Sequence, residues 1–592
     1  MHFGGIYEDE IVGKAYDRAL MFRFARYLRP YRWQVIGTLC LLPLTTAAKL
    51  AQPWLIKLAI DNHIVTGNLA GLPAMAAWFL LLILADSLVS FLQVWLLQYL
   101  GQRVMQDIRL ELFTHVQRLS TSFFDRTPTG SLVTRLTSDV EVLGEMFAAG
   151  IITVVGDVML LAGIVGVMVW MNLRLSLVTF TVLPFLIWVA FTFRRRMRTA
   201  FRQVRARLSN LNTFLAESIG GMAVVQLFNR QAAEQTEFRR LNAEYRDANL
   251  PVITWDAALY AAVEALSSIA VGLLVWYGGG EIVRGALTFG ALVAFIQYIE
   301  KFFAPIRDLS AKYSVMQGAM AALERLFNLL DTSELLPEAP PETMTIPARP
   351  ASVIEFNGVW FAYKEEEYVL KGVDLTLRRG ETVALVGETG GGKTTVTRLL
   401  SRLYDVSRGS ISLDGVDLRR IPLWELRRRI GVVLQEPYLF TGTIADNICL
   451  GDDTVRPRVR EAAALVGADR FIDRLGSGYG EAVRERGNNF SAGERQLISF
   501  ARAVAFDPEI LVLDEATASV DTTSERLIQE GLKGLMAGRT TLVVAHRLST
   551  IRDADRIAVI HRGEKVEEGR HEELIARQGL YYRLYQLQFK DN

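Results

Sequence analysis

Apolar residues form long runs over the first half of the chain and short runs over the second half. Residues 33–310 are far more apolar than residues 350–592. A helix crosses hydrocarbon with about 20 residues, at about 1.5 Å per residue. Six runs reach that length, at 33–60, 74–102, 146–172, 174–194, 254–278 and 286–308. The pattern predicts an all-α membrane domain of six spanning helices, followed by a domain of a different kind.

Lysine and arginine are distributed unevenly between the two sides of these runs. Three segments are rich in them: the N-terminal 32 residues with six, 103–145 with five and 194–249 with eleven. The three short segments on the opposite side carry only Arg174 and Arg284. Because cytoplasmic loops are enriched in these residues, we expect both termini to be cytoplasmic, with the chain in the cell inner or plasma membrane.

The two long cytoplasmic segments have helical rather than disordered character. Around 103–120, apolar residues recur at helical spacing. The spanning helices are therefore predicted to continue past the bilayer and to turn back at short connecting helices. The predicted turns are 121–131, where Pro128 and Gly130 break the helix, and the region near Gly220.

Ionisable residues within the apolar runs mark places where the helices must pack around charge. They are Lys49, Lys57, Asp86, Asp157, Glu264 and Glu300. Charge at bilayer depth is costly, so each is expected to face the bundle interior, water or another helix. Two interpretations stay open for each residue, a polar substrate or ion path and packing between helices. Asp157 lies deepest in its run and is the first functional candidate.

Composition separates the remaining parts of the chain. Segment 1–32 has no cleavable signal pattern and is typical of an amphipathic entry helix. The membrane domain is placed at 33–330 and a charged, proline-rich linker at 331–352. Residues 353–592 alternate short β-branched runs with helical segments, as α/β domains do. The net charge of +1 gives no field for nucleic acid, and two cysteines imply no disulfide framework.

A phosphate-binding loop lies at the start of the α/β domain. The apolar run 382–386 predicts a buried strand that leads into Gly387–Thr394, which fits G-x-x-x-x-G-K-[ST]. Backbone N–H groups of such a loop and the following helix N-terminus bind phosphate oxygens. Lys393 is expected to reach the β- and γ-phosphates of ATP, and Thr394 to ligate Mg²⁺. The residues expected to contact the nucleotide here are Gly387, Glu388, Thr389, Gly390, Gly391, Gly392, Lys393, Thr394 and Thr395.

A second buried strand ends on two carboxylates. Residues 510–513 are apolar, and Asp514 and Glu515 follow them. Asp514 is placed to bind Mg²⁺ at the strand end, and Glu515 to polarise the attacking water. A strand that simply ends at a polar turn gives the same pattern, so other motifs must decide between these interpretations.

Those other motifs occur in an order that resembles the ABC exporters, a family with six membrane helices fused to one ATP-binding cassette domain. Tyr363 in Val-Trp-Phe-Ala-Tyr, Gln435 in Val-Val-Leu-Gln-Glu-Pro and His546 in Val-Val-Ala-His-Arg carry the resemblance, which covers essentially the whole chain. It implies that Tyr363 stacks on adenine, Gln435 contacts Mg²⁺, and His546 contacts the γ-phosphate. Lys393, Gln435, Glu515 and His546 then form the catalytic set.

The resemblance also implies a dimer. The segment Phe490-Ser-Ala-Gly-Glu494 stands at the family's signature position, where Ser491 and Gly493 contact ATP held by the phosphate loop of another domain. Asp521, in Ala-Ser-Val-Asp, matches the loop that touches the partner domain. One chain carries one phosphate loop and one signature segment, so a second half-transporter is needed to complete each site.

The signature segment departs from the family's usual Leu-Ser-Gly-Gly-Gln. Ala492 replaces a glycine, and Glu494 replaces a glutamine, which adds negative charge near a triphosphate. Arg484 stands where the family has glycine. An altered signature beside an intact Glu515 is typical of one half of a heterodimeric exporter, the half whose own ATP pocket hydrolyses. We favour that arrangement over a homodimer in which the altered signature still works.

The leading function is ATP-driven export of drugs, lipids or other small amphiphiles across the bilayer. The alternatives are a homodimeric lipid flippase, a peptide exporter and an ATP-gated channel. A peptide exporter that cleaves a leader needs an N-terminal protease domain, and only 32 residues precede the first run. The sequence leaves the substrate, and the residues that line its cavity, unassigned.

Overall fold

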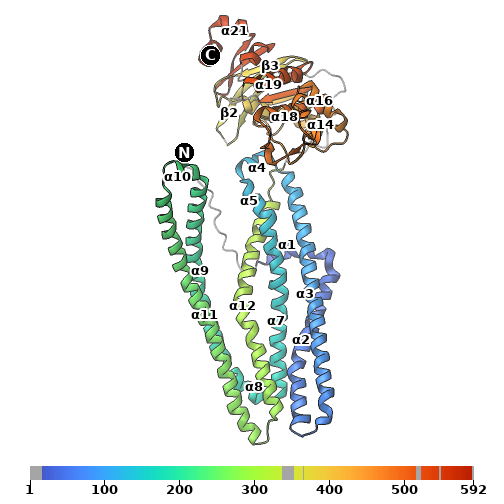
Figure 1. Cartoon of the computed structure of the whole chain (residues 1–592), viewed down its shortest axis with the longest axis vertical. Helices are drawn as coiled ribbons and strands as arrows, with labels where there is room; N and C mark the ends of the chain where they lie inside the picture. Colours follow the sequence, from blue (N-terminus) through green and yellow to red (C-terminus); the bar gives the residue numbers. More distant parts are fainter. Residues whose placement is uncertain (1–16, 336–352, 365, 515–521, 546–547, 590–592) are drawn as a thin grey trace. The chain divides into compact units, whose positions relative to one another are not determined.

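The computed structural model describes residues 17–335, 353–364, 366–514, 522–545 and 548–589. The chain divides into two compact units, one of residues 1–117 and 129–332, the other of residues 118–128 and 333–592. The first unit is helical and the second contains the sheets (Figure 1). The short segment 118–128 thus groups with the α/β unit rather than with the membrane helices that flank it.

The helical unit contains six helices long and apolar enough to cross a membrane, which confirms the predicted number. Its helices are α1 (Arg18–Leu28), α2 (Arg32–Ala59), α3 (Leu72–Gln117), α5 (Thr129–Thr134), α6 (Val140–Glu145), α7 (Ile151–Met171), α8 (Leu173–Phe180), α9 (Leu183–Gly220), α10 (Met222–Leu227), α11 (Gln231–Val283) and α12 (Phe289–Leu330).

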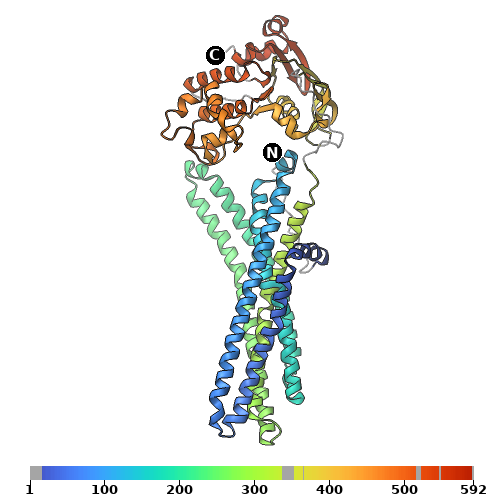
Figure 2. The same ribbon diagram turned by 90° about the vertical axis from the view of Figure 1, so that its right-hand side faces the viewer.

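Four of these helices, α3, α9, α11 and α12, are much longer than a bilayer requires. At about 1.5 Å per residue, the 46 residues of α3 extend about 69 Å, against a hydrocarbon thickness of about 30 Å. The prediction that spanning helices continue beyond the membrane is confirmed by α3, α9, α11 and α12. Figure 2 shows α9 and α11 running side by side, joined by α10. The helix breaks after Arg126 and at Gly220 fall where Pro128 and the Gly220 region predicted them.

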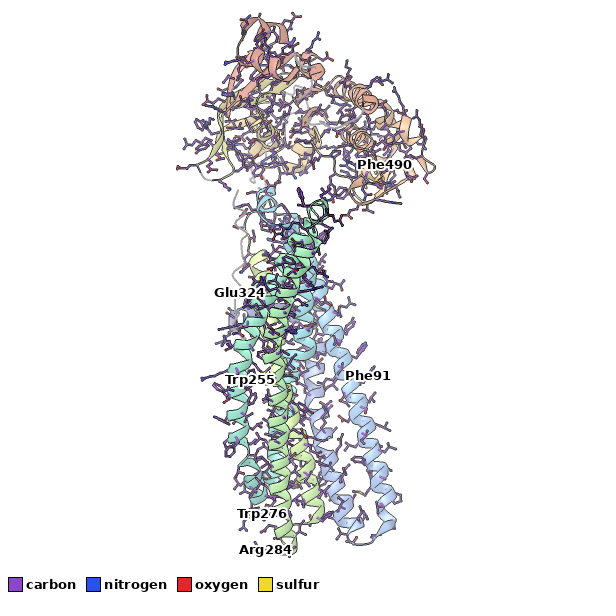
Figure 3. The ribbon with its side chains drawn as sticks, turned by 60° about the vertical axis from the view of Figure 1, so that its left-hand side comes forward. Phe91, Trp255, Trp276, Arg284, Glu324 and Phe490 are labelled. Atoms are coloured by element: carbon purple, nitrogen blue, oxygen red, sulfur yellow. The ribbon has the colours of Figure 1, made fainter. Side chains whose placement is uncertain are left out.

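Apolar side chains divide between the inside and the outside of the bundle. Ile164, Leu274 and Phe295 are fully buried where α7, α11 and α12 pack together. Phe91 and Trp276, by contrast, project from the bundle and are 64% and 77% exposed (Figure 3). An apolar outer surface of this kind is stable only against lipid or another apolar surface.

The α/β unit has two main sheets. The strands are β1 (Ile354–Ala362), β2 (Tyr368–Leu377), β3 (Thr382–Val386), β4 (Arg408–Leu413), β5 (Val416–Asp417), β6 (Ile430–Val433), β7 (Gly442–Thr443), β8 (Ala482–Val483), β9 (Ile510–Asp514), β10 (Thr540–Val544), β11 (Arg556–His561) and β12 (Glu564–Gly569). The larger sheet has the order β12-β11-β3-β10-β9-β6, and the smaller, antiparallel sheet has the order β2-β1-β4-β5.

In the larger sheet, every pair except β11–β12 is parallel. The helices of this unit are α4 (Thr121–Arg126), α13 (Lys393–Leu400), α14 (Leu423–Arg429), α15 (Ile444–Cys449), α16 (Val459–Leu465), α17 (Asp469–Ile472), α18 (Ala492–Ala505), α19 (Thr522–Met536), α20 (Leu548–Arg552), α21 (His571–Arg577) and α22 (Leu580–Phe589). Strands β9 and β10 are buried along their whole length, and the burial of β9 confirms the prediction from its apolar run.

Candidate nucleotide-binding site

The candidate site lies at the carboxyl edge of the larger sheet. Four neighbouring parallel strands, β3, β10, β9 and β6, end at this edge and lead into the sequence motifs. The phosphate loop follows β3, Asp514 ends β9, and Gln435 lies two residues beyond β6. Ligands of open α/β sheets bind at this edge because the loops that leave the strands meet there.

The phosphate loop is shaped by glycines that have no room for a side chain. A Cβ on Gly387 would lie 2.0 Å from the backbone carbonyl oxygen of Ile560, on the neighbouring strand β11. Gly392, with φ of +102°, caps α13, and a Cβ there would lie 2.7 Å from the Leu370 side chain. These contacts give a physical reason for the glycine spacing.

Lys393 is buried at the start of α13 and spans the loop. Its ammonium donates hydrogen bonds to the carbonyl oxygens of Gly387 and Glu388, both at 2.8 Å. Burial lowers the pKa of Lys393, while the negative charges of Asp514 and Glu388 act in the opposite direction. The geometry fits a loop that holds phosphate, because the ammonium is already centred among the backbone groups that would surround it.

Hydroxyl and carboxyl oxygens lie near this loop. Thr394 is half-buried in the first turn of α13, Thr395 beside it is buried, and Asp514 is 8% exposed at the end of β9. Gln435 is exposed. Oxygen ligands of this kind suit Mg²⁺. Three further sequence-predicted residues, Glu515, Asp521 and His546, lie outside the described residues.

Tyr363, expected to stack on adenine, follows β1 and takes part in an aromatic cluster. Its hydroxyl lies 3.2 Å from the Thr395 hydroxyl, and its ring packs edge-on against Tyr404, with centroids 5.2 Å apart. Tyr363 is 40% exposed, so part of this residue is accessible to a ligand. Sequence reasoning did not find Tyr404, because no motif marks it.

The same cluster reaches α4, within the α/β unit. The Tyr404 hydroxyl donates a hydrogen bond to Asp125 of α4, and the Arg398 guanidinium lies 3.9 Å from the same carboxylate. Burial, followed by the bond to Asp125, raises the pKa of Tyr404. The connecting helix between two membrane helices is therefore tied through one side chain to the candidate adenine-binding tyrosine.

The signature segment caps α18. The Ser491 hydroxyl accepts from the Glu494 N–H at 3.3 Å, and the Glu494 carboxylate accepts from the Ser491 N–H at 2.8 Å. This reciprocal arrangement is a capping box, for which S-x-x-E is the sequence signal. The extra charge at position 494 thus lies over the helix N-terminus, where it offsets the positive end of the helix dipole. Gly493 is buried in the first turn of the helix.

Comparisons with known proteins agree with this architecture. Residues 35–306 match the family described as "ABC transporter transmembrane region", and residues 370–518 match the family described as "ABC transporter". An uncharacterised ABC transporter ATP-binding protein of Bacillus subtilis (strain 168), YknV, is 38% identical over 584 residues, which cover 98% of this chain and 96% of that protein.

Two further relatives extend the comparison to transport and to structure. An ATP-dependent lipid A-core flippase of Syntrophus aciditrophicus (strain SB) is 36% identical over 574 residues, 96% of this chain and 94% of that protein. A solved bacterial Atm1-family ABC exporter with ATP bound is 27% identical, with a TM-score of 0.78, over 94% of this chain and 99% of that chain. The chain is a multi-pass membrane protein with an ATP-hydrolysing domain coupled to transport, and it belongs to the ABC exporter family.

Proposed function

We propose that this chain is one subunit of a dimeric exporter that uses ATP hydrolysis to move small amphiphiles out of the cell across the inner or plasma membrane. One observation carries the proposal: the same chain contains six helices that can span a membrane and an α/β sheet. The phosphate loop and Asp514 lie at one edge of that sheet. The flippase among its relatives, named for lipid A-core, supports an amphiphilic substrate. Both termini and the ATPase domain are cytoplasmic in this proposal, as the lysine and arginine distribution predicts.

In the proposed ATP site each residue has one task. Tyr363 stacks on adenine, the loop Gly387–Gly392 and Lys393 bind the phosphates, and Glu515 accepts the proton of the water that attacks the γ-phosphorus. His546 contacts the γ-phosphate. Thr394, Gln435 and Asp514 are the residues that would hold Mg²⁺, which neutralises phosphate charge when it is bound.

Binding of two ATP molecules is proposed to close two cassette domains around each other. Ser491 and Gly493 of one subunit contact ATP on the other, and Asp521 touches the partner domain. Closure is transmitted to the membrane helices through α4, which Asp125 ties to Tyr404, and through the segment around α10. Val224 and Phe228, which are 57% and 72% exposed at α10, offer an apolar surface for that contact.

We further propose that the partner is a different chain. The Glu494 carboxylate occupies the Ser491 N–H and places negative charge at the helix terminus that would face the partner's ATP. The pocket that combines the partner's phosphate loop with this chain's signature segment therefore binds ATP more weakly. The other pocket, which contains this chain's Glu515, hydrolyses ATP. A homodimer remains the alternative arrangement.

Purification of the full chain with and without a co-expressed second half-transporter tests this arrangement. ATP hydrolysis is expected only when both chains are present. In a homodimer of this chain, both ATP pockets would contain the altered signature segment. Full activity from this chain alone would establish the homodimer instead.

Replacement of Glu494 by Gln is expected to strengthen ATP binding in the partner's pocket. Glutamine retains an oxygen that accepts from the Ser491 N–H but removes the charge, and one charge near a triphosphate in a water-exposed site is worth about 1 kcal/mol. That energy corresponds to about a fivefold lower Kd for ATP at this pocket. Titration of the assembled dimer with a fluorescent ATP analogue measures the change.

The control for this change is Glu485→Gln, which removes an exposed carboxylate from the same loop but leaves the capping box intact. It is expected to leave both ATP affinities unchanged. If the two variants bind ATP equally, the charge of Glu494 does not weaken the signature, and the argument for a heterodimer loses its physical basis.

A further inference from the structure

A proline in the first spanning helix leaves a carbonyl group that the last spanning helix binds. Pro53 has no N–H, so the carbonyl oxygen of Lys49, four residues earlier in α2, lacks its helical partner. The Lys301 ammonium of α12 donates to that oxygen at 2.9 Å. One turn earlier on α12, the Tyr298 hydroxyl donates to the carbonyl oxygen of Leu50 at 2.6 Å. The carbonyl group that Pro53 leaves free thus holds Lys301 against α2.

A single amide separates Lys301 from the nearest carboxylate. The Lys301 ammonium donates to Gln52 Oε1 at 2.7 Å, and Gln52 Nε2 donates to Asp86 Oδ2 at 3.1 Å. The second carboxylate oxygen of Asp86 is buried, and the described part of the chain provides it with no hydrogen-bond donor. Two of the three Lys301 donors are used, so one N–H and one carboxylate oxygen remain available.

These groups lie at similar depth in the membrane. Lys49 is about 15 Å from the α2 end at Ala59, Asp86 about 21 Å from the α3 start at Leu72, and Lys301 about 18 Å from the α12 start at Phe289, at about 1.5 Å per residue. Those ends lie on the extracytoplasmic side of the predicted topology. With a hydrocarbon layer of about 30 Å, the cluster is near the middle of the bilayer.

The charges of this cluster do not balance. Asp86 and Lys49 are the charged groups close enough to act on the Lys301 ammonium. The Lys49 side chain is exposed and forms an ion pair with none of the described residues. Two ammonium groups therefore share one carboxylate, and an uncompensated charge at this depth is costly.

Two other carboxylates in the spans, by comparison, are paired. Asp157, the first candidate from the sequence, forms an ion pair with Lys312. Asp61 accepts from the Gly290 N–H at 2.8 Å and from the Thr288 hydroxyl at 2.7 Å, with Lys57 3.7 Å away. These pairs are satisfied within the bundle, which assigns them to helix packing rather than to a ligand.

We propose that Lys49, Lys301 and Asp86 form a binding site for the head group of an amphiphile that carries one negative charge and one acidic or hydroxyl hydrogen. A phosphate monoester has this chemistry. Its charged oxygens would accept from Lys49 and from the remaining N–H of Lys301, and its hydroxyl would donate to Asp86 Oδ1. The proposal rests on the proposed export function, because it specifies the class of substrate.

Binding of radiolabelled dodecyl phosphate to the full chain in lipid nanodiscs, without ATP, tests the site. Lys49→Gln is expected to raise the Kd about tenfold, since a hydrogen bond to a charged group is lost. Lys49→Arg keeps the charge and is expected to restore most of the affinity. Lys49 makes no described side-chain contact that holds the fold, so the variant should assemble normally.

The matched control is Lys57→Gln, which removes the same charge from the same helix about 12 Å away, at about 1.5 Å per residue. It is expected to leave the Kd for dodecyl phosphate unchanged. Equal affinity of Lys49→Gln and the wild type would overturn the site, as would tighter binding of dodecyltrimethylammonium than of dodecyl phosphate by the wild type.

The outcome is separable from that of the export proposal. Binding that depends on Lys49, in a protein that moves no amphiphile when ATP is added, would support the site and contradict export. Transport that proceeds equally well with Lys49→Gln, together with unchanged dodecyl phosphate binding, would support export and contradict the site.

Discussion

Replacement of Glu515 by Gln is expected to lower steady-state ATP hydrolysis of the assembled transporter by about 100-fold or more. A general base contributes about 10²–10⁴-fold to proton transfer, and glutamine has the same shape without the basic carboxylate. Glu515 directly follows Asp514 at the buried end of β9, which β10 separates from β3, the strand that leads into the phosphate loop. ATP binding should persist, because Lys393 and the loop glycines are unchanged.

Phosphate release and ATP-analogue binding, measured on the same preparation, check this expectation. The control is Glu530→Gln on α19, which removes a carboxylate from an exposed ion pair with Arg470. That variant should hydrolyse ATP at the wild-type rate. Undiminished hydrolysis by Glu515→Gln would exclude Glu515 as the base, whereas loss of both binding and hydrolysis would point to a folding defect.

Replacement of Gly387 by Ala is expected to weaken ATP binding on the order of 10–100-fold. The added methyl group would lie 2.0 Å from the Ile560 carbonyl oxygen, which belongs to the backbone of β11 and cannot move aside without disturbing the sheet. Overpacking of this kind typically costs about 1–3 kcal/mol. The loop must shift, and the carbonyl groups that hold Lys393 shift with it.

Isothermal titration with a non-hydrolysable ATP analogue measures this loss. Gly476→Ala provides the control, because no atom lies within 4 Å of the Cβ position at that glycine of the same domain. The control should bind ATP normally. Wild-type affinity in Gly387→Ala would mean that the loop tolerates the methyl group and that its geometry does not determine nucleotide binding.

The broad architecture could be predicted because two sequence patterns, the apolar run and the phosphate-loop spacing, each lie within one short segment of the chain. A run of about 20 apolar residues marks a span without any knowledge of its neighbours. The phosphate-loop spacing, set between a strand and a helix, likewise indicates its own position in the fold. The structure confirmed six spanning helices, the strand before Gly387 and the strand that ends at Asp514.

Interactions between distant segments were beyond that reasoning. The pairs Asp157–Lys312 and Asp125–Tyr404 join residues more than 150 positions apart, and no local pattern connects them. The contact of Lys301 with the carbonyl group freed by Pro53 depends on how α12 packs against α2. Tertiary packing determines each of these, so a helical or strand period cannot reveal them.

The capping box of the signature segment is a different case. Ser491 and Glu494 have the S-x-x-E spacing that predicts reciprocal capping, so the orientation of the Glu494 carboxylate was available from the sequence. Against the usual signature, Glu494 differs by its negative charge. The structure shows that the same residue both stabilises the helix start and places charge there.

ATP-driven accumulation of an amphiphilic dye in sealed proteoliposomes tests the central proposal most directly. With cassette domains facing outward, wild-type transporter should concentrate the dye inside against its gradient when ATP and Mg²⁺ are added, and Glu515→Gln should abolish the accumulation. Movement of dye only down its gradient, at the same rate in wild type and Glu515→Gln, would indicate a channel and contradict the account of this chain as an exporter subunit.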